Sequence, residues 1–177
     1  TQFAKTAQAY VTSSVHAKGD ELKLLLGLAS EVTNKKVLDV ATGGGHTALA
    51  FAKAGANVTA IDLTPTMLET AQAFVISQGV DTVKFQEAKA EALPFENQSF
   101  DIVTCRIAAH HFAEPETFVA ETARVLKPDG MFLLVDNISP QDKKLAEVMN
   151  FIETTRDPSH IWAYSVSTWT QWLTKAG

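Results

Sequence analysis

An apolar run, three consecutive glycines and a small-residue helix follow one another between residues 37 and 52, and this order constrains the fold more than any other feature. The apolar run, residues 37–40, is typical of a buried strand. Glycines at a strand-to-helix turn allow a sharp backbone bend and let a ligand approach the main chain closely. The helix after them presents N–H groups that favour electron-rich ligand atoms. The stretch therefore predicts a ligand-binding turn at the end of a buried strand.

Two carboxylates sharpen this prediction. Asp39 lies inside the turn motif, where its charge would repel the pyrophosphate of a dinucleotide but would favour the ammonium and sulfonium groups of S-adenosylmethionine, which has no phosphate. Asp62 ends a second apolar run about 20 residues after the glycines, the position of the acid that binds both ribose hydroxyls in nucleotide-binding folds. The alternatives are that Asp39 only caps a structural turn and that Asp62 only caps the next helix.

Strand and helix patterns alternate along the chain. Strands are predicted at residues 37–40, 57–62, 81–86, 100–105 and 131–136, and helices begin near residues 20, 47, 64, 115 and 139, with one more in the tail. This alternation predicts an α/β fold: a doubly wound, Rossmann-like sheet of at least five parallel strands with helices on both faces. Ligands of such sheets bind at the carboxyl ends of the strands, where the winding reverses.

Composition limits the class of protein. At 177 residues, the chain is predicted to be a single domain, and its net charge of −5 argues against a dedicated nucleic-acid surface. Cys105 is the only cysteine, so neither an internal disulfide nor a cysteine-based zinc site is possible. We therefore expect a cytoplasmic protein with no bound metal, and no apolar run is long enough to span a membrane.

Four segments, in the right order, resemble the class I S-adenosylmethionine-dependent methyltransferases, and within them the UbiE-like, type 11 family. They are the glycine motif at residues 37–45, the acid Asp62, the stretch through residues 90–103 and the turn at residues 124–130. The resemblance covers roughly residues 35 to 140 and implies a cofactor-binding core there. It also implies a lead or cap at residues 1–35 and a helical part, incomplete for the family, at residues 141–177.

The sequence departs from the family at three places. Ala41 stands where the family commonly has its first glycine, and a single methyl group should leave the turn intact. Lys89 replaces an aspartate that touches the adenine amino group in many members, so adenine would be held by the backbone near Ala90 and by Leu63. The family's final antiparallel strands are missing from residues 157–177, which would leave a sheet edge exposed.

The resemblance implies S-adenosylmethionine as cofactor and S-adenosylhomocysteine as product. Gly43 and Gly45 would let the backbone approach the methionine part, Asp39 would help to hold its ammonium group, and Arg106 would lie near it or form a surface ion pair. The full set of predicted cofactor-binding residues is Asp39, Ala41, Thr42, Gly43, Gly45, Asp62, Leu63, Met67, Lys89, Ala90, Glu91 and Arg106.

Two histidines follow the fourth predicted strand, next to the expected position of the methyl group. Either His110 or His111 could take a proton from the substrate, or either could simply pack against the following helix. Tyr10 and His16, in the N-terminal lead, are further candidates for substrate contact, together with His110. Two adjacent histidines make a poor metal site, so no metal is predicted.

The acceptor is expected to be a small molecule. Amine-methylating enzymes that act on nucleic-acid bases carry, by the same resemblance, Asn or Asp, two prolines and an aromatic residue after this strand, whereas this chain has Arg106-Ile107-Ala108-Ala109. Quinol precursors and other aromatic metabolites are candidates by resemblance. The competing interpretations are an NAD-type oxidoreductase, against which Asp39 and the absent G-x-G-x-x-G spacing count, and a non-catalytic domain that binds S-adenosylmethionine. The oligomeric state is not predicted.

Overall fold

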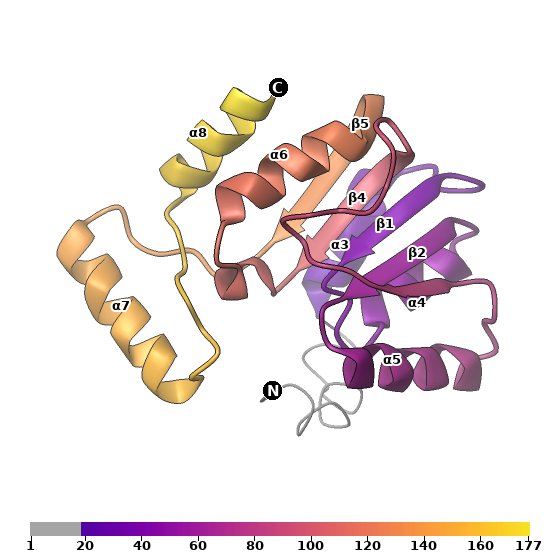
Figure 1. The fold of residues 1–177 in the computed structure, drawn as a ribbon, viewed down its shortest axis with the longest axis horizontal. Helices are drawn as coiled ribbons and strands as arrows, with labels where there is room; N and C mark the ends of the chain where they lie inside the picture. The colour runs from indigo at the N-terminus through magenta and orange to yellow at the C-terminus, as the bar shows by residue number, and fades with distance from the viewer. Residues whose placement is uncertain (1–18) are drawn as a thin grey trace.

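A five-stranded parallel sheet with helices on both faces forms the centre of the protein (Figure 1). The structure is a computed structural model and describes residues 19–177; the N-terminal candidates Tyr10 and His16 lie outside this range. The elements in order are α3 (Asp20–Ala29), β1 (Lys36–Val40), α4 (His46–Lys53), β2 (Asn57–Asp62), α5 (Pro65–Ser77), β3 (Lys84–Glu87), β4 (Phe100–Arg106), η1 (Ala109–His111), α6 (Pro115–Val125), β5 (Leu126–Val135), α7 (Lys143–Arg156) and α8 (Val166–Ala176). The predicted α/β, doubly wound fold class is confirmed.

The strand order is β3-β2-β1-β4-β5, so the chain winds outward from β1 in one direction and returns through β4 to wind in the other. β1 is hydrogen-bonded to both β2 and β4, and Val40 lies level with Ile61 on one side and Cys105 on the other. Its central position explains why residues 37–40 are all buried. The carboxyl ends of β1 and β4 form the switch point, which is where ligands of such sheets bind.

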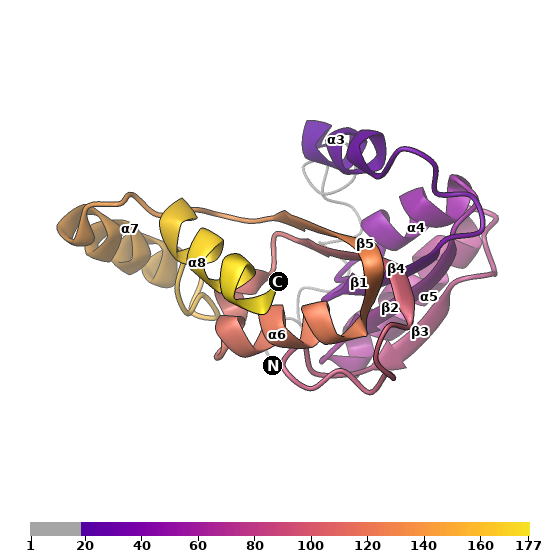
Figure 2. The same cartoon turned by 90° about the horizontal axis from the view of Figure 1, so that it is seen from above.

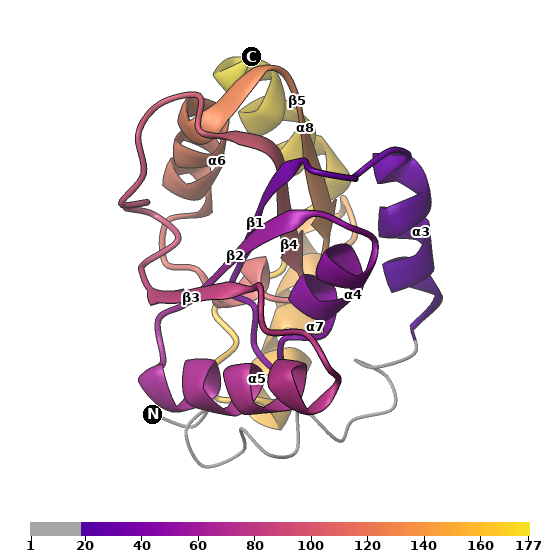
Figure 3. The same ribbon diagram turned by 90° about the vertical axis from the view of Figure 1, so that its right-hand side faces the viewer.

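Successive side chains of the central strands alternate between two cores. Val37 faces a cluster with α3, α4 and α5, whereas Leu38 and Val40 face a second cluster with α6 and Trp169 of α8. Figures 2 and 3 show α3 and α4 on one side of the sheet and α6 on the other. Because both faces are covered, β1 is buried from Val37 to Val40, and Asp39 is the one polar residue of that stretch.

Strand boundaries differ from the prediction at β3 and β5. β3 begins at Lys84 rather than residue 81, and β5 begins at Leu126 rather than residue 131. Leu126 pairs with Phe100 and Met131 pairs with Ile102, so the intervening turn residues form an irregularity within one strand. The prediction was wrong because a Pro-Asp-Gly sequence indicates a turn but does not show whether strand pairing resumes on both sides of it.

The predicted helices are present in the structure, but some of them begin at a different residue. α7 begins at Lys143, three residues after Pro140, because Asp142 is the N-cap and accepts a hydrogen bond from the Leu145 amide at 3.0 Å. The first helix, predicted to begin near residue 20, has Asp20 as its first residue and Gly19 as its N-cap. α5 begins at Pro65, close to its predicted start, and its N-cap is Thr64, whose side chain makes no capping bond.

The region after β5 is irregular and helical in the part of the chain that the structure describes. α8 lies beside α6 (Figure 1), where Trp169 and Trp172 meet edge to face at 5.2 Å between ring centroids. β5 is therefore an edge of the described sheet, as the sequence predicts. None of the helices in residues 19–177 has the length and apolar character needed to cross a bilayer.

Candidate active site

A cavity of about 590 Å³ lies at the carboxyl ends of β1, β2 and β4, beside the switch point. Eleven of the twelve predicted cofactor-binding residues line it: Asp39, Ala41, Thr42, Gly43, Asp62, Leu63, Met67, Lys89, Ala90, Glu91 and Arg106. The twelfth, Gly45, is not in the lining. The volume lies within the range of small-molecule sites, which is about 300 to 1,000 Å³.

The glycine turn uses left-handed backbone at alternate residues. Ala41, Gly43 and Gly45 have φ values of 54°, 55° and 82°. A Cβ on Gly43 would meet nothing closer than the Met67 methyl carbon at 3.8 Å, so the half-buried main chain of Gly43 borders open cavity space. A Cβ on Gly45 would instead lie 3.1 Å from the Ala71 side chain, so Gly45 lets the turn pack against α5.

Asp39 is a buried carboxylate at the floor of the cavity. It accepts hydrogen bonds from the hydroxyls of Thr42, at 2.6 Å, and Thr104, at 2.8 Å. Burial raises its pKa to about 6, although the two hydroxyls and the charge of Arg106 oppose this shift. Keeping such a group ionised at neutral pH costs free energy, which a nearby cation would offset.

Asp62 is held by the two turns that frame the cavity. One carboxylate oxygen accepts the Gly43 amide at 3.1 Å, and the other accepts the Thr64 amide at 2.9 Å. Burial raises the pKa of this carboxyl, while these amides act in the opposite direction. Asp62 therefore connects the glycine turn to the start of α5 and also lines the cavity. These contacts give Asp62 a structural role, and ribose binding stays a prediction.

Arg106, at the end of β4, forms an ion pair that is not on the open surface. Its guanidinium lies 2.8 Å from the Glu21 carboxylate of α3, and its Nε donates to the Thr47 hydroxyl at 3.1 Å. The arginine side chain is only 6% exposed. Glu21 and Thr47 were not predicted as site residues, because nothing in their local sequence places them beside the end of β4.

The segment after β3 lines the cavity and also supports the start of α6. Ala90 is buried in the lining, and Lys89 is half exposed with its ammonium 3.9 Å from Glu91. The Glu91 carboxylate accepts the amides of Ala113, at 3.1 Å, and Glu114, at 3.3 Å, just before α6. Glu91 therefore holds the start of α6 at the cavity rim.

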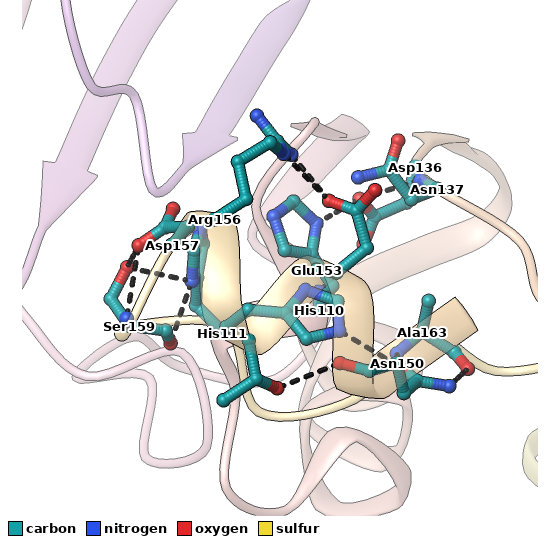
Figure 4. A network of polar contacts seen from close by, with 12 residues as sticks. His110, His111, Asp136, Asn137, Asn150, Glu153, Arg156, Asp157, Ser159 and Ala163 are labelled. Atoms are coloured by element: carbon teal, nitrogen blue, oxygen red, sulfur yellow. Dashed lines mark hydrogen bonds and ion pairs between the residues drawn. The ribbon is translucent and has the colours of Figure 1, made fainter. Parts of the chain in front are cut away.

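The two histidines of η1 have different surroundings (Figure 4). His111 lines the cavity, and its Nδ1 lies 2.8 Å from the Ser159 carbonyl oxygen. His110 is buried outside the lining, with its Nδ1 2.5 Å from the Asp136 carboxylate and its amide donating to the same group at 2.7 Å. The structure thus brings only one of the two predicted proton acceptors, His111, to the cavity.

Several lining residues were not predicted. Ile107, Phe112, Pro158 and Ser159 close the side of the cavity next to His111. Ile107 has a left-handed backbone with φ of 54°, which is rare for a β-branched residue. Pro158 and Ser159 come from the link between α7 and α8, and no sequence signal joins that link to the end of β4. Within residues 19–177, no cluster of three or more side chains suited to metal binding is found.

Sequence comparison places this geometry in a known family. A family model described as a methyltransferase domain, type 11, matches residues 38–134. The uncharacterized methyltransferase YcgJ of Bacillus subtilis is 46% identical over 169 residues, covering 96% of this chain and 67% of that protein. A ubiquinone biosynthesis O-methyltransferase of Paracidovorax citrulli is 41% identical over 105 residues, covering 59% of this chain and 44% of that enzyme. Segments of these relatives therefore have no counterpart in the chain.

Solved structures agree with this assignment. The crystal structure of YcgJ from Bacillus subtilis has a TM-score of 0.87 and 44% identity, covering 89% of this chain and 67% of that one. A phosphoethanolamine methyltransferase of Haemonchus contortus, solved with S-adenosylhomocysteine, has a TM-score of 0.80 at 21% identity, covers 98% of this chain and 42% of that one, and shows the shared fold alone. The chain belongs to the type 11 family of class I S-adenosylmethionine-dependent methyltransferases.

Proposed function

We propose that this protein transfers a methyl group from S-adenosylmethionine to a small-molecule acceptor, with the acceptor bound beside His111. The observation that carries the proposal is the asymmetry of the cavity. One end has the buried acid Asp39, the acid Asp62 and open main chain at Gly43. The other end has His111, whose neutral imidazole could accept a proton, beside apolar side chains such as those of Phe112 and Pro158.

The residues of the first end fit the cofactor. Asp62 lines the cavity between the glycine turn and the start of α5, and its carboxylate would accept the ribose hydroxyls there. The negative charge of Asp39 would stabilise the ammonium group, and Arg106 would stabilise the carboxylate of the methionine part. When bound, S-adenosylmethionine supplies an electrophilic methyl group, and the protein orients and desolvates the reactants.

Adenine would lie against the apolar residues of the same end. Leu63 is 62% exposed although it borders the cavity, and Met67 is buried beneath. An exposed leucine at a cavity mouth offers one face for a flat apolar partner. The main chain at Ala90, which is buried in the lining, would provide hydrogen bonds in place of the side-chain carboxylate that Lys89 replaces.

His111 would take the proton of the acceptor. Burial lowers the pKa of its imidazole below the ordinary value, so the ring is neutral and able to accept a proton at physiological pH. The acceptor would then be a hydroxyl or another group that must lose a proton as it is methylated. Apolar surroundings favour an aromatic or similarly apolar metabolite, and a quinol precursor would fit, as the identity to ubiquinone biosynthesis O-methyltransferases suggests.

The experiment is methyl transfer from labelled S-adenosylmethionine to a panel of phenols, quinol precursors and amines. Calorimetric titration with S-adenosylhomocysteine accompanies it, because a domain that only binds the cofactor would give binding without transfer. We expect micromolar binding and transfer to at least one phenolic acceptor, reduced by more than tenfold in His111→Gln with cofactor affinity unchanged. Absence of S-adenosylhomocysteine binding at millimolar ligand would overturn the cofactor assignment. Binding without transfer would favour the non-catalytic alternative.

A further inference from the structure

The link between α7 and α8 is bound to the histidine pair through main-chain atoms. The His110 carbonyl oxygen accepts the amides of Ile161, at 2.9 Å, and Trp162, at 3.0 Å. The Ser159 carbonyl oxygen lies 2.8 Å from His111 Nδ1 (Figure 4). These contacts join segments 48 or more residues apart and make Ser159 part of the cavity wall. His110 thus supports the link from outside the cavity, whereas His111 contacts it from within.

The contact with Ser159 determines which nitrogen of His111 carries the proton. A carbonyl oxygen can only accept, so Nδ1 of His111 must be the protonated nitrogen. The lone pair of the neutral ring is then on Nε2. For a histidine that removes a proton from an acceptor, this choice of tautomer decides which atom can do so.

Asn150 of α7 holds the link in a single arrangement. Its Oδ1 accepts the Ala163 amide at 2.6 Å and contacts His160 Nε2 at 2.7 Å. Its Nδ2 donates to the carbonyls of Ala146, at 2.9 Å, and Ala163, at 3.2 Å. An amide N–H only donates, so the orientation of the Asn150 side chain is determined, and His160 Nε2 must carry a proton. Asn150 is 1% exposed and makes the four bonds that its side chain allows.

We propose that His160 and Asn150 are positioning residues for the proton acceptor of the methyl-transfer reaction. Together they hold residues 157–163 against η1, so that the Ser159 carbonyl keeps His111 in the Nδ1–H tautomer, with the lone pair of the ring on Nε2. Neither residue lines the cavity. The inference rests on the proposed role of His111. It means that the tautomer of His111 is determined by the link between α7 and α8, whose sequence shows no catalytic motif.

The test reads the tautomer of His111 directly, by long-range proton–nitrogen correlation spectra of the protein labelled with ¹⁵N-histidine. The chain has five histidines, and His111→Gln identifies the signal of interest by its loss. At a pH where the ring is neutral, we expect the parent protein to show a protonated Nδ1. A protonated Nε2 in the parent would overturn the inference at once.

Two substitutions of His160 separate positioning from general stability. His160→Leu removes the donor to Asn150 at similar size, whereas the side-chain amide of His160→Gln can still donate. We expect a mixture of His111 tautomers in the leucine variant and the Nδ1–H tautomer in the glutamine variant. Binding of S-adenosylhomocysteine should stay within twofold in both, since the cofactor end is unchanged. With an accepted phenol, turnover should fall about tenfold in the leucine variant and recover with glutamine.

A merely structural role would lower the melting temperature of His160→Leu and leave the tautomer of His111 unchanged, and that result would overturn the inference. If the leucine variant does not fold, Asp157→Ala gives the same test, because Asp157 accepts the Ser159 amide at 2.9 Å and the Ser159 hydroxyl at 2.6 Å. Asp157→Asn, which keeps an accepting oxygen, is its matched control. If no acceptor is methylated, the proposed function fails, whereas the spectra still decide whether the link sets the tautomer.

Discussion

The cofactor end and the acceptor end of the cavity are built in different ways. At the cofactor end, Asp62 reaches the Gly43 amide across only 19 positions of sequence, and the shape depends on main-chain conformation at residues 41–45. At the acceptor end, His111 meets Ser159 across 48 positions, and the shape depends on side chains that bind distant main chain. The first end should therefore be sensitive to any added Cβ, and the second to the loss of single polar groups.

The largest expected effect is on the glycine turn. Gly43→Val should abolish binding of S-adenosylhomocysteine, because its side chain would occupy the cavity where the ligand must approach the main chain. The free protein has room for the side chain, so the fold should persist, less stable by about 1–2 kcal/mol because φ is positive. Calorimetric titration beside a circular dichroism spectrum measures both quantities. Normal binding by a folded variant would mean that the cofactor does not lie across this turn.

Gly45 is the control for Gly43, since both have positive φ but only Gly43 lines the cavity. A Cβ at Gly45 would lie 3.1 to 3.3 Å from atoms of Ala71 and Val75 on α5. Gly45→Ala should therefore lower the melting temperature more than Gly43→Ala does. If Gly45→Ala instead leaves stability unchanged and removes binding, the division of roles within the turn is wrong.

Asp62→Ala should weaken binding of S-adenosylhomocysteine by about 2–4 kcal/mol, or roughly 30- to 1,000-fold, because two charge-assisted hydrogen bonds to ribose are lost. The substitution also leaves the Gly43 and Thr64 amides without their acceptor, so stability should fall as well. Asp62→Asn, which keeps one accepting oxygen, should lie between the parent and Asp62→Ala. Affinity within twofold of the parent would assign Asp62 to structure alone.

Asp39→Asn should make the folded protein more stable but weaken its binding of the cofactor. The folded-state pKa of about 6 exceeds the ordinary 3.8, so the folded protein holds this proton more readily than the unfolded chain. The contribution of Asp39 is thus most favourable below pH 4 and is lost as the pH rises through about 6. At pH 8 the asparagine variant should be more stable than the parent by about 1–3 kcal/mol, because it avoids the buried charge.

Denaturant titrations at pH 8 and pH 4 measure this difference, which should be close to zero at the lower pH. Binding of S-adenosylhomocysteine should weaken at pH 8, since the charge that faces the ammonium group is gone. A variant that is less stable than the parent at pH 8 would show that the hydroxyls of Thr42 and Thr104 cannot bind the amide. Unchanged affinity would remove Asp39 from the cofactor site.

The same contrast explains what the sequence could predict. The parallel doubly wound sheet and the position of the glycine turn and Asp62 at the cavity were predictable, because short contiguous segments carry their periodicity and turn chemistry. The wall at Pro158 and Ser159 was not, because a residue of an irregular link reveals nothing of its distant partners. Glu91 lines the cavity as expected and also supports α6, and this second contact was not predictable, since the sequence cannot show which amides a carboxylate will reach.

Ala41 provides the smallest effect and tests whether the cofactor end depends on backbone conformation. Its φ of 54° is left-handed, a region that costs an L-residue about 1–2 kcal/mol and glycine almost nothing. Glycine also loses about 0.5–1 kcal/mol more on folding than alanine, so Ala41→Gly should stabilise the protein by at most about 1.5 kcal/mol. This corresponds to a rise in melting temperature of up to about 6 °C, with cofactor affinity unchanged.

Ala50→Gly is the matched control, because the same exchange within α4 has no left-handed residue to relieve. It should destabilise the protein by about 0.5–1 kcal/mol. Opposite signs for the two substitutions would show that alanine is strained at position 41 and that the turn keeps its conformation despite the methyl group. Equal destabilisation by both would mean that the turn has no such strain, and the contrast between a backbone-built cofactor end and a side-chain-built acceptor end would lose its main support.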